Sequence, residues 1–289
     1  MGFSFEKVCV VGVGLIGGSM ALGMRRERLA KKIIGVGRGE DNLKQALALG
    51  IIDSYTFKIE EGVENADLVI LATPVRAMPE LAERAKTYFK NGTILTDVGS
   101  TKLRLIQKIS PTLSPEVDFV PAHPIAGREK TGARYSDPDI FKGRWTIITP
   151  CERSTEEGVE KIKSLWKSLG AKVEIMDAKT HDELLAWISH LPHIVVYALV
   201  GTLLDMERKA PLLRFSAGGF RDFIRIAGSS PEMWRDIFLE NKEYVIATIR
   251  RYQKELEELA ELIQKEDAKS LEEYFAKARE VKEKVQKDG

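Results

Sequence analysis

The sequence predicts an α/β protein, with a doubly wound parallel sheet followed by an all-helical region. Up to about residue 150, short β-branched runs alternate with amphipathic segments, which is the pattern of β-α-β units. A glycine-rich turn follows the first run, and from residue 179 the apolar spacing is helical almost to Gly289. We therefore expect two domains, residues 1–178 and 179–289.

The expected strands of the first domain share apolar, β-branched side chains, and they are Val8–Val11, Lys32–Val36, Asp67–Leu71, Thr93–Thr96, Asp118–Val120 and Trp145–Ile148. The capping-box pattern at 154–157 predicts a helix that stops at Gly170, and the run 171–176 predicts one more strand of the same sheet.

The helical region is expected to begin with a second capping box at 180–183. Ser230 and Pro231 predict the start of a helix whose apolar stripe continues to Leu256. A helix of that length is typical of packing against a second subunit. A final amphipathic helix is expected from about residue 271 to 285.

The composition favours a small polar ligand over a macromolecular one. Lysine and arginine number 44 against 43 acidic residues, a net charge of +1, so no field recruits nucleic acid or a membrane surface. The two cysteines form no disulfide or metal pattern, and the first residues resemble neither a signal peptide nor a myristoylation signal, so we expect a cytoplasmic protein. The apolar window 186–204 is interrupted by two histidines and a proline and predicts a buried helix rather than a membrane span.

Gly12-Val-Gly14-Leu15-Ile16-Gly17 lies between an expected strand and an expected helix, which is the context of a dinucleotide-binding, or Rossmann, turn. The first glycine permits the tight turn, the second lets the backbone approach a pyrophosphate, and the third allows close helix packing. We expect Gly12, Gly14, Leu15, Ile16 and Gly17 to bind the cofactor; the alternative is a glycine turn without a nucleotide.

The end of the second strand bears on the choice of cofactor. NAD enzymes place an acid there, whereas this chain has Arg38, which can pair with a 2′-phosphate and favours NADP over NAD. Glu40 and Asp41 lie just beyond and can reach a ribose, so use of both cofactors stays open, as does a purely solvated Arg38.

Three other strand ends carry polar side chains that can face the same crevice. Thr73 and Pro74 follow one strand and are expected beside the cofactor. Ser100 follows the next and can contact substrate and cofactor, or cap a helix near Thr101. His123 follows the run 117–121 and is a candidate base; the alternative is a histidine that only binds a loop.

The helical region adds histidines and arginines. Ser189-His-Leu-Pro-His193 contains a proline that predicts a kink, and the histidine spacing matches no zinc pattern, so no metal is expected although His181 and Asp182 are near. The run 218–225 carries Arg221 and Arg225, which suit a carboxylate, although Arg225 can equally form a surface ion pair.

Six motifs together resemble the prephenate dehydrogenases, the prephenate/arogenate (cyclohexadienyl) dehydrogenase family of tyrosine biosynthesis. They are the glycine turn, Asp97-Val-Gly-Ser100, His123-Pro-Ile-Ala-Gly127, Ser189-His-Leu-Pro-His193, Gly218-Gly-Phe-Arg-Asp-Phe223 and Met233-Trp-Arg-Asp-Ile237. The resemblance implies a Rossmann domain joined to an all-helical dimerisation domain, with the active site in the cleft between them.

The implied reaction is an oxidative decarboxylation of prephenate or arogenate with hydride transfer to NAD or NADP. By matching motif, His123 would accept the C4 hydroxyl proton, Ser100 would orient that hydroxyl, His193 would bind near the side-chain carboxylate, and Arg225 would hold the ring carboxylate. The remaining expected substrate contacts are Arg221, Glu129, Arg128 and Trp234.

The family resemblance leaves several points open. Many relatives have threonine at the position of Arg128, so the contacts to the substrate side chain and inhibition by tyrosine stay open. The longer relatives' regulatory or chorismate mutase domain is not expected after residue 289. The resemblance implies a homodimer.

Two other functions share part of this sequence pattern. A β-hydroxyacid dehydrogenase would need a catalytic lysine early in the helical region, and none lies between Lys179 and Lys209. A nucleotide-sensing protein without chemistry would have no need of His123, His193 and Arg225 together.

Overall fold

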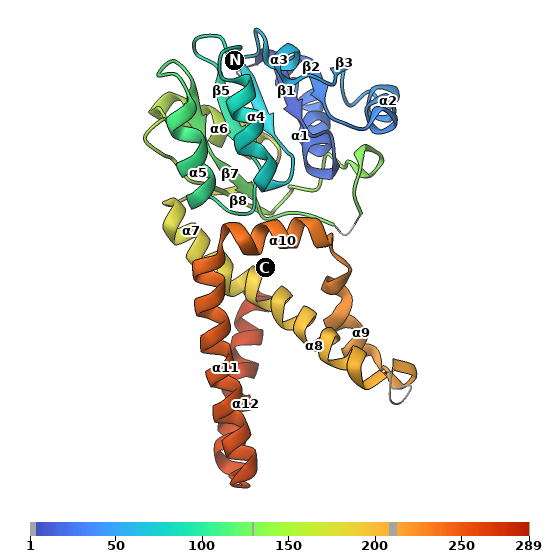
Figure 1. Ribbon diagram of the computed structural model, residues 1–289, viewed down its shortest axis with the longest axis vertical. Coiled ribbons are helices and arrows are strands. Elements are labelled where there is room, and N and C mark those ends of the chain that lie inside the picture. Colours follow the sequence, from blue (N-terminus) through green and yellow to red (C-terminus); the bar gives the residue numbers. More distant parts are fainter. Residues whose placement is uncertain (1–3, 129, 208–212, 289) are drawn as a thin grey trace. The chain divides into compact units, whose positions relative to one another are not determined.

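The computed structural model describes residues 4–128, 130–207 and 213–288 (Figure 1). It divides into two compact units, Met1–Lys242 and Glu243–Gly289. The first unit contains the sheets and the helices around them together with the first part of the helical region. The second contains the two C-terminal helices.

The main sheet has the strand order β3-β2-β1-β4-β5-β6, and all its neighbours are parallel. Its strands are β1 (Phe5–Val11), β2 (Ala30–Val36), β3 (Ser54–Thr56), β4 (Leu68–Leu71), β5 (Ile94–Asp97) and β6 (Asp118–Val120). The central strands β4 and β5 are buried at every position, which explains their unbroken apolar runs. The expected doubly wound sheet is confirmed.

Helices cover both faces of this sheet (Figure 1). They are α1 (Leu15–Arg26), α2 (Glu40–Ala48), α3 (Ile59–Val63), α4 (Met78–Ala85), α5 (Leu103–Ile109) and α6 (Glu156–Ser168). One core lies under α1, α2 and α6 and includes Met20, Leu43 and Trp166. A second core lies under α3, α4 and α5 and includes Met78 and Leu105. The site therefore stands on a sheet that is held rigid from both sides.

A second, three-stranded sheet corrects the expectation that all strands of the domain join one sheet. It consists of β7 (Ala122–Pro124), β8 (Trp145–Ile148) and β9 (Lys172–Ile175), with β7 antiparallel to β8. Pro121 has no N–H to donate to the β5 ladder, and the chain leaves the main sheet there. His123 therefore lies within β7, opposite Ile147, rather than in a loop after a strand.

The two expected capping boxes are displaced. Thr155, not Ser154, caps α6 by accepting from the N–H of Gly158 (3.0 Å), while the Ser154 hydroxyl binds the carbonyl of Phe119. Asp177 caps α7 (Ala178–Leu185) by accepting from the N–H of Thr180 (2.9 Å). The N-cap accepts from the amide three positions on, so each helix starts where that partner is present.

The helical part of the first unit follows α7. A π-helical turn at Ala186–His190 precedes Pro192, which confirms the expected irregularity, and α8 (Leu191–Glu207), α9 (Gly218–Ile224) and α10 (Pro231–Glu240) follow. Ser230 caps α10 as expected.

The single long helix expected from Pro231 to beyond Leu256 is wrong. The chain breaks at Asn241, whose side-chain amide donates to the carbonyl of Asp182 (2.8 Å). This contact holds Asn241 outside helical geometry at the end of α10.

The second unit is a pair of helices, α11 (Lys242–Gln264) and α12 (Ala268–Asp288), and the last amphipathic helix is thereby confirmed. Tyr274 of α12 forms a hydrogen bond with Glu255 of α11, and burial followed by this bond raises the pKa of the Tyr274 phenol.

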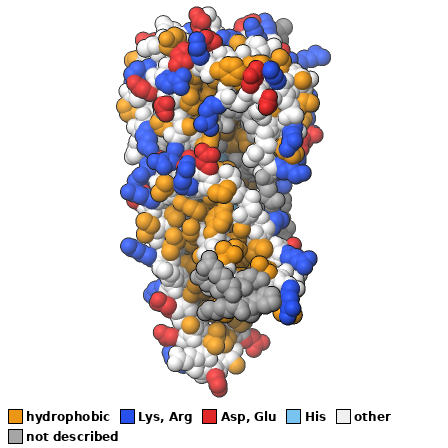
Figure 2. Space-filling model, turned by 45° about the vertical axis from the view of Figure 1, so that its right-hand side comes forward, with side chains coloured by type: hydrophobic (Ala, Val, Ile, Leu, Met, Phe, Trp, Pro, Cys, Tyr) orange, Lys and Arg blue, Asp and Glu red, His pale blue; other side chains and the backbone are white. Residues whose placement is uncertain are grey.

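The apolar helix expected to be buried is largely uncovered. The segment Ala178–Leu204 is long and apolar enough to cross a membrane by length and composition alone, yet only 22% of its apolar window is buried. Ile188 is 71% exposed, and Trp187 and Leu204 are also exposed. Figure 2 shows hydrophobic side chains gathered on the face where α8 and α9 come forward. This face has the character of a surface that another protein chain covers.

Trp166 anchors the first core. Its indole is fully buried and packs edge-on against the ring of Phe141, with ring centroids 5.1 Å apart. Trp166→Ala should lower the free energy of unfolding by about 3–5 kcal/mol in urea titrations, because a large cavity replaces the indole. The exposed neighbour Lys167→Ala should change it by less than about 0.5 kcal/mol. Equal effects of the two substitutions would contradict this assignment of the core.

Candidate active site

The carboxyl ends of neighbouring strands bring the predicted polar residues to one edge of the main sheet. Thr73 and Pro74 follow β4. Ser100 lies three residues after β5, the strand that pairs directly with β4. The Thr73 hydroxyl is buried and has no hydrogen-bond partner among the described residues. Ser100 is partly exposed and does not cap α5, whose N-cap is Lys102, so the capping alternative for Ser100 is wrong.

The glycine turn has the shape of a phosphate cradle. Gly12 has φ +97°, and a Cβ there would stand 2.5 Å from the carbonyl oxygen of Ala72. A Cβ on Gly17 would stand 2.3 Å from the carbonyl oxygen of Gly12. At Gly14, by contrast, a Cβ would meet nothing within 4 Å. The first and third glycines are therefore required by packing, while the second leaves its side open for a pyrophosphate.

Leu15 and Ile16 open α1 directly after this turn. Leu15 is buried in the first core, whereas Ile16 is partly exposed. At the end of β2, Arg38 is exposed, and Glu40 beyond it forms an ion pair with Lys44 (3.0 Å).

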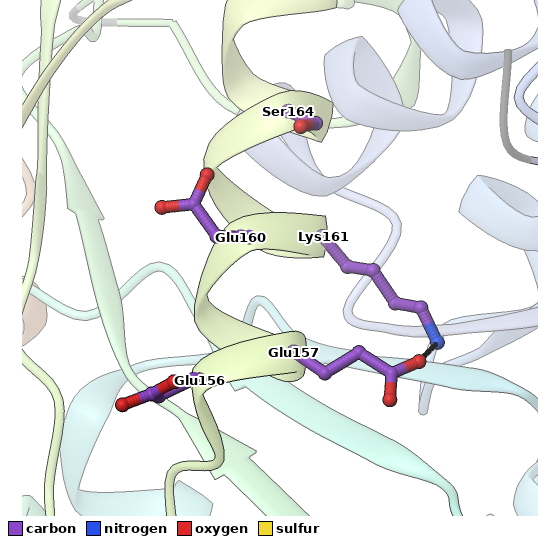
Figure 3. A pocket seen from close by; sticks show the side chains of 5 residues that line it. All are labelled: Glu156, Glu157, Glu160, Lys161 and Ser164. Atoms are coloured by element: carbon purple, nitrogen blue, oxygen red, sulfur yellow. Dashed lines mark ion pairs between the residues drawn. The ribbon is translucent and has the colours of Figure 1, made fainter.

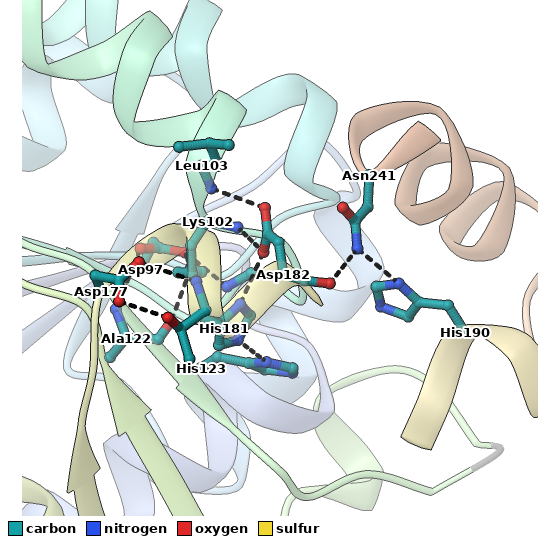
Figure 4. A network of polar contacts seen from close by, with 12 residues as sticks. Asp97, Lys102, Leu103, Ala122, His123, Asp177, His181, Asp182, His190 and Asn241 are labelled. Carbon is teal, nitrogen blue, oxygen red and sulfur yellow. Dashed lines mark hydrogen bonds and ion pairs between the residues drawn. The ribbon is translucent and has the colours of Figure 1, made fainter. Parts of the chain in front are cut away.

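A fully buried ion pair lies beneath the strand ends (Figure 4). Lys102 Nζ binds the Asp97 carboxylate and also donates to the carbonyl of Ala122 (2.9 Å). The N–H of Gly99 donates to the same carboxylate (2.7 Å). Burial lowers the pKa of Lys102 and raises that of Asp97, and the attraction between the two groups opposes both shifts. The pair joins β5, the Ser100 turn and β7 at one point.

His123, His181 and Asp182 form a line of hydrogen bonds next to this pair (Figure 4). His123 Nδ1 lies 2.8 Å from His181 Nε2, and His181 Nδ1 lies 2.7 Å from Asp182 Oδ1. Burial, followed by the nearby charges of His181, Lys102 and His190, holds the pKa of His123 well below 6.5. The His123 imidazole is therefore neutral at pH 7 and able to accept a proton.

A second group of rings lies on α8 and α10. The imidazole of His193 stacks on the indole of Trp234, with ring centroids 3.6 Å apart and planes 23° apart. His193 Nδ1 donates to the carbonyl of Ser189 (2.9 Å), which leaves Nε2 as an acceptor, and burial lowers the His193 pKa. The Trp234 side chain is only 6% exposed. It therefore supports the His193 ring and has little free surface with which to contact a ligand.

Contacts within the first unit connect the two groups of rings. The Asn241 amide lies 3.0 Å from His190 Nδ1 and donates to the backbone of Asp182, next to His181. Burial lowers the pKa of His190 to about 4. Glu240 on α10 pairs with Lys108 of α5 (2.6 Å) and Arg76 after β4 (3.3 Å), which holds α10 against the sheet-bearing part.

The structure does not bring the predicted arginines into these groups. Arg128 forms an ion pair with Asp137 at the surface. Arg221 on α9 and Arg225 directly after α9 are exposed. Glu129 lies outside the described residues.

The sequence analysis missed the roles of His181, Asp182 and Lys102. Two signals were available: a His-Asp pair near the start of a helix and a lysine five residues after Asp97. Neither signal shows which residue the side chain contacts in the folded protein. Within residues 4–128, 130–207 and 213–288, no three histidine, cysteine or acidic side chains converge as metal ligands.

One surface hollow lies apart from this network. It lies on α6 and is lined by Glu156, Glu157, Glu160, Lys161 and Ser164, with an ion pair between Glu157 and Lys161 (Figure 3). Its lining is an ordinary solvated helix face.

Comparison with known proteins identifies two family models along the chain. The prephenate dehydrogenase nucleotide-binding domain matches residues 20–175, and the prephenate dehydrogenase dimerization domain matches residues 177–277. The chain is 36% identical to the prephenate dehydrogenase of Bacillus subtilis over 96% of its length and 76% of that protein. It is 33% identical to the cyclohexadienyl dehydrogenase of Zymomonas mobilis over 96% of its length and 95% of that protein.

A solved structure is similar along the whole chain. It is the Aquifex aeolicus prephenate dehydrogenase in complex with hydroxyphenyl propionate and NAD+, with a TM-score of 0.93 and 38% identity. The match covers 99% of this chain and 100% of that one. The dimerization-domain match includes α8 and its exposed apolar side chains.

The glycine turn predicts different consequences for two similar substitutions. Gly14→Ala should leave the unfolding free energy within about 0.5 kcal/mol, yet raise the Kd for the nicotinamide dinucleotide at least ~tenfold, because the methyl group occupies the open cradle. Gly17→Ala should instead destabilise the fold by about 1–3 kcal/mol, since its Cβ overlaps backbone. Calorimetric titration and urea unfolding measure both, and normal nucleotide affinity of Gly14→Ala would rule out the cradle.

Proposed function

The chain belongs to the prephenate dehydrogenase family, and from this we propose that His123 takes the proton in its reaction. The reaction is the oxidative decarboxylation of prephenate or arogenate, with hydride transfer to NAD or NADP. The neutral, buried His123 held between the strand ends and His181 carries the proposal.

In this reaction His123 would have one task, which is to accept the proton of the C4 hydroxyl group. A hydride leaves C4 of the cyclohexadienyl ring, the C4 hydroxyl proton moves to His123, and the C1 carboxylate leaves as CO2 while the ring becomes aromatic. The nicotinamide, when bound, is the hydride acceptor. The C4 hydroxyl becomes strongly acidic as the hydride departs, so a neutral imidazole suffices as base even with a lowered pKa.

Other side chains are proposed to hold the substrate. Ser100, at the end of the neighbouring strand, would orient the C4 hydroxyl and border the nicotinamide. His193, whose free nitrogen is Nε2, would bind near the side-chain carboxylate, with Trp234 supporting it from behind. Arg225 would pair with the ring carboxylate, and Arg221, Arg128 and Glu129 remain proposed contacts.

The cofactor preference is proposed to be NADP over NAD. Arg38 follows β2, where it can reach a 2′-phosphate, and no ion pair occupies its guanidinium among the described residues. Glu40, the nearest acid able to bind a ribose, is already paired with Lys44. Both observations favour the phosphorylated cofactor.

The dimerization domain indicates that the chain forms a dimer, and we propose a homodimer that covers α8. A cytoplasmic location is proposed from the two free cysteines and the balanced charge. Tyrosine carries the para-hydroxyl of the product, so it would compete for Ser100 and His123 as an inhibitor.

The test of the reaction follows nicotinamide reduction in four mixtures, prephenate and arogenate each with NAD and NADP. Reduction with at least one substrate is expected, together with release of CO2. No nicotinamide reduction in any of the four mixtures would overturn the proposed function.

His123→Asn should lower kcat by roughly 10²–10⁴-fold, because no base remains, while the Kd for the dinucleotide changes less than about twofold. In the unsubstituted enzyme, kcat/KM should stay level as the pH falls through 6.5. It should decline only well below that pH, because the lowered pKa keeps His123 deprotonated there. A near-normal rate of His123→Asn would remove it as the base.

Arg38→Ser should raise the KM for NADP at least ~tenfold and change that for NAD less than about twofold. Lys31→Ser, an exposed substitution near the opposite end of β2, serves as the matched control and should change neither constant. A parallel rise for both cofactors would contradict phosphate recognition by Arg38.

A further inference from the structure

We propose that His181 and Asp182 are positioning residues that fix the tautomer of His123, so that its lone pair for proton uptake lies on Nε2. The proposal rests on His123 as the base of the proposed function. It follows from the hydrogen-bond line His123–His181–Asp182 (Figure 4).

The Asp182 carboxylate determines the first proton. It accepts from the backbone N–H groups of Lys102 (2.8 Å, to Oδ1) and Leu103 (2.9 Å, to Oδ2), both of which can only donate. The side chain is 1% exposed, and a carboxylate can only accept hydrogen bonds. The contact of 2.7 Å between Asp182 Oδ1 and His181 Nδ1 therefore requires the proton on His181 Nδ1.

The state of His181 determines the second proton. Burial lowers the His181 pKa, against the opposing hydrogen bond to Asp182, so the ring is neutral at pH 7 and its Nε2 carries a lone pair. His123 Nδ1 lies 2.8 Å from that nitrogen, and two lone pairs at this distance would repel. His123 Nδ1 therefore carries the hydrogen, and His123 Nε2 is left as the acceptor.

Among the surrounding groups, only the hydrogen-bonded line through His181 to Asp182 favours proton uptake by His123. His181, Lys102 and His190 oppose a positive charge on His123, with burial as the largest effect. Asp97 and Asp182 are the negative groups of the network, and Asp97 is already occupied by Lys102. Asp182 can stabilise the imidazolium through the polarised His181 ring, as the third group of a catalytic triad does.

The same carboxylate connects the base with the Ser100 turn. Asp182 belongs to α7 in the helical part, and the two amides that it accepts from begin α5, two and three residues after Ser100. One side chain thus sets the position of the α5 start and the direction of the His181 ring. A displacement of Asp182 would disturb both groups that meet the C4 hydroxyl.

The test compares two substitutions of His181 in the full-length enzyme. His181→Leu removes the acceptor for His123 Nδ1–H and should lower kcat by about 10²-fold or more, with substrate KM and dinucleotide Kd within about threefold. His181→Gln supplies an amide oxygen near the position of Nε2 and should recover at least ~tenfold of that loss. Glu183→Gln, an exposed position on the same helix, should keep the original rate.

Nitrogen NMR of the ¹⁵N-histidine-labelled enzyme reports the tautomer without turnover. His123 should show a protonated Nδ1 and an unprotonated Nε2 at pH 7, and His181→Leu should show a mixture of both forms. A normal kcat of His181→Leu, an equal loss in the Leu and Gln variants, or an Nε2-protonated His123 would each overturn the proposal. If the unsubstituted enzyme reduced no nicotinamide with either substrate, the proposed function would be overturned instead. The NMR result would still decide which tautomer His123 has.

Discussion

The buried carboxylate of Asp182 is the contact on which the arrangement of the site depends. An uncompensated charge at 1% exposure would cost several kcal/mol, so its environment must supply donors. These donors are the amides of Lys102 and Leu103 and the ring of His181. Because the carboxylate belongs to α7 and the amides to α5, satisfying the charge also fixes the helical part of the first unit against the sheet-bearing part.

The Asp97–Lys102 pair extends the same constraint to the strands. Asp97 ends β5, and Lys102 reaches the carbonyl of Ala122 beside His123. Loss of either charge would leave the other buried and unpaired, which is far more destabilising than a surface pair. The polar groups around His123 are therefore held in position before substrate arrives, and little reorganisation would accompany the proposed proton transfer.

Local spacing made the sheet, the glycine turn and the roles proposed for His123 and Ser100 predictable from the sequence. Gly12 and Gly17 are each required because a Cβ would overlap nearby backbone, and Gly14 leaves the turn open, all within six residues. Long-range contacts explain the failures. Three features depend on contacts with residues far away in the sequence, which a local pattern cannot predict. They are the separate β7–β9 sheet, the helix break at Asn241, and the contact of His123 with His181, 58 residues away. The cap at Asp177 was missed because Thr180 offered an equally good local pattern.

The pKa of His123, the proposed base, lies well below 6.5, which suits this reaction because the substrate changes the electrostatics of the site. In the free enzyme, burial, followed by the influence of His181, Lys102 and His190, holds the pKa of His123 well below 6.5, so its imidazole is neutral. Prephenate brings two carboxylates and arogenate a net negative charge, and negative charge nearby raises the pKa of an imidazole. The base is therefore strengthened only when substrate is bound. Loss of CO2 would leave a phenolate at the C4 oxygen. The proton on His123 would then pass back to that oxygen, so that the product leaves as a neutral phenol and His123 returns to its neutral form.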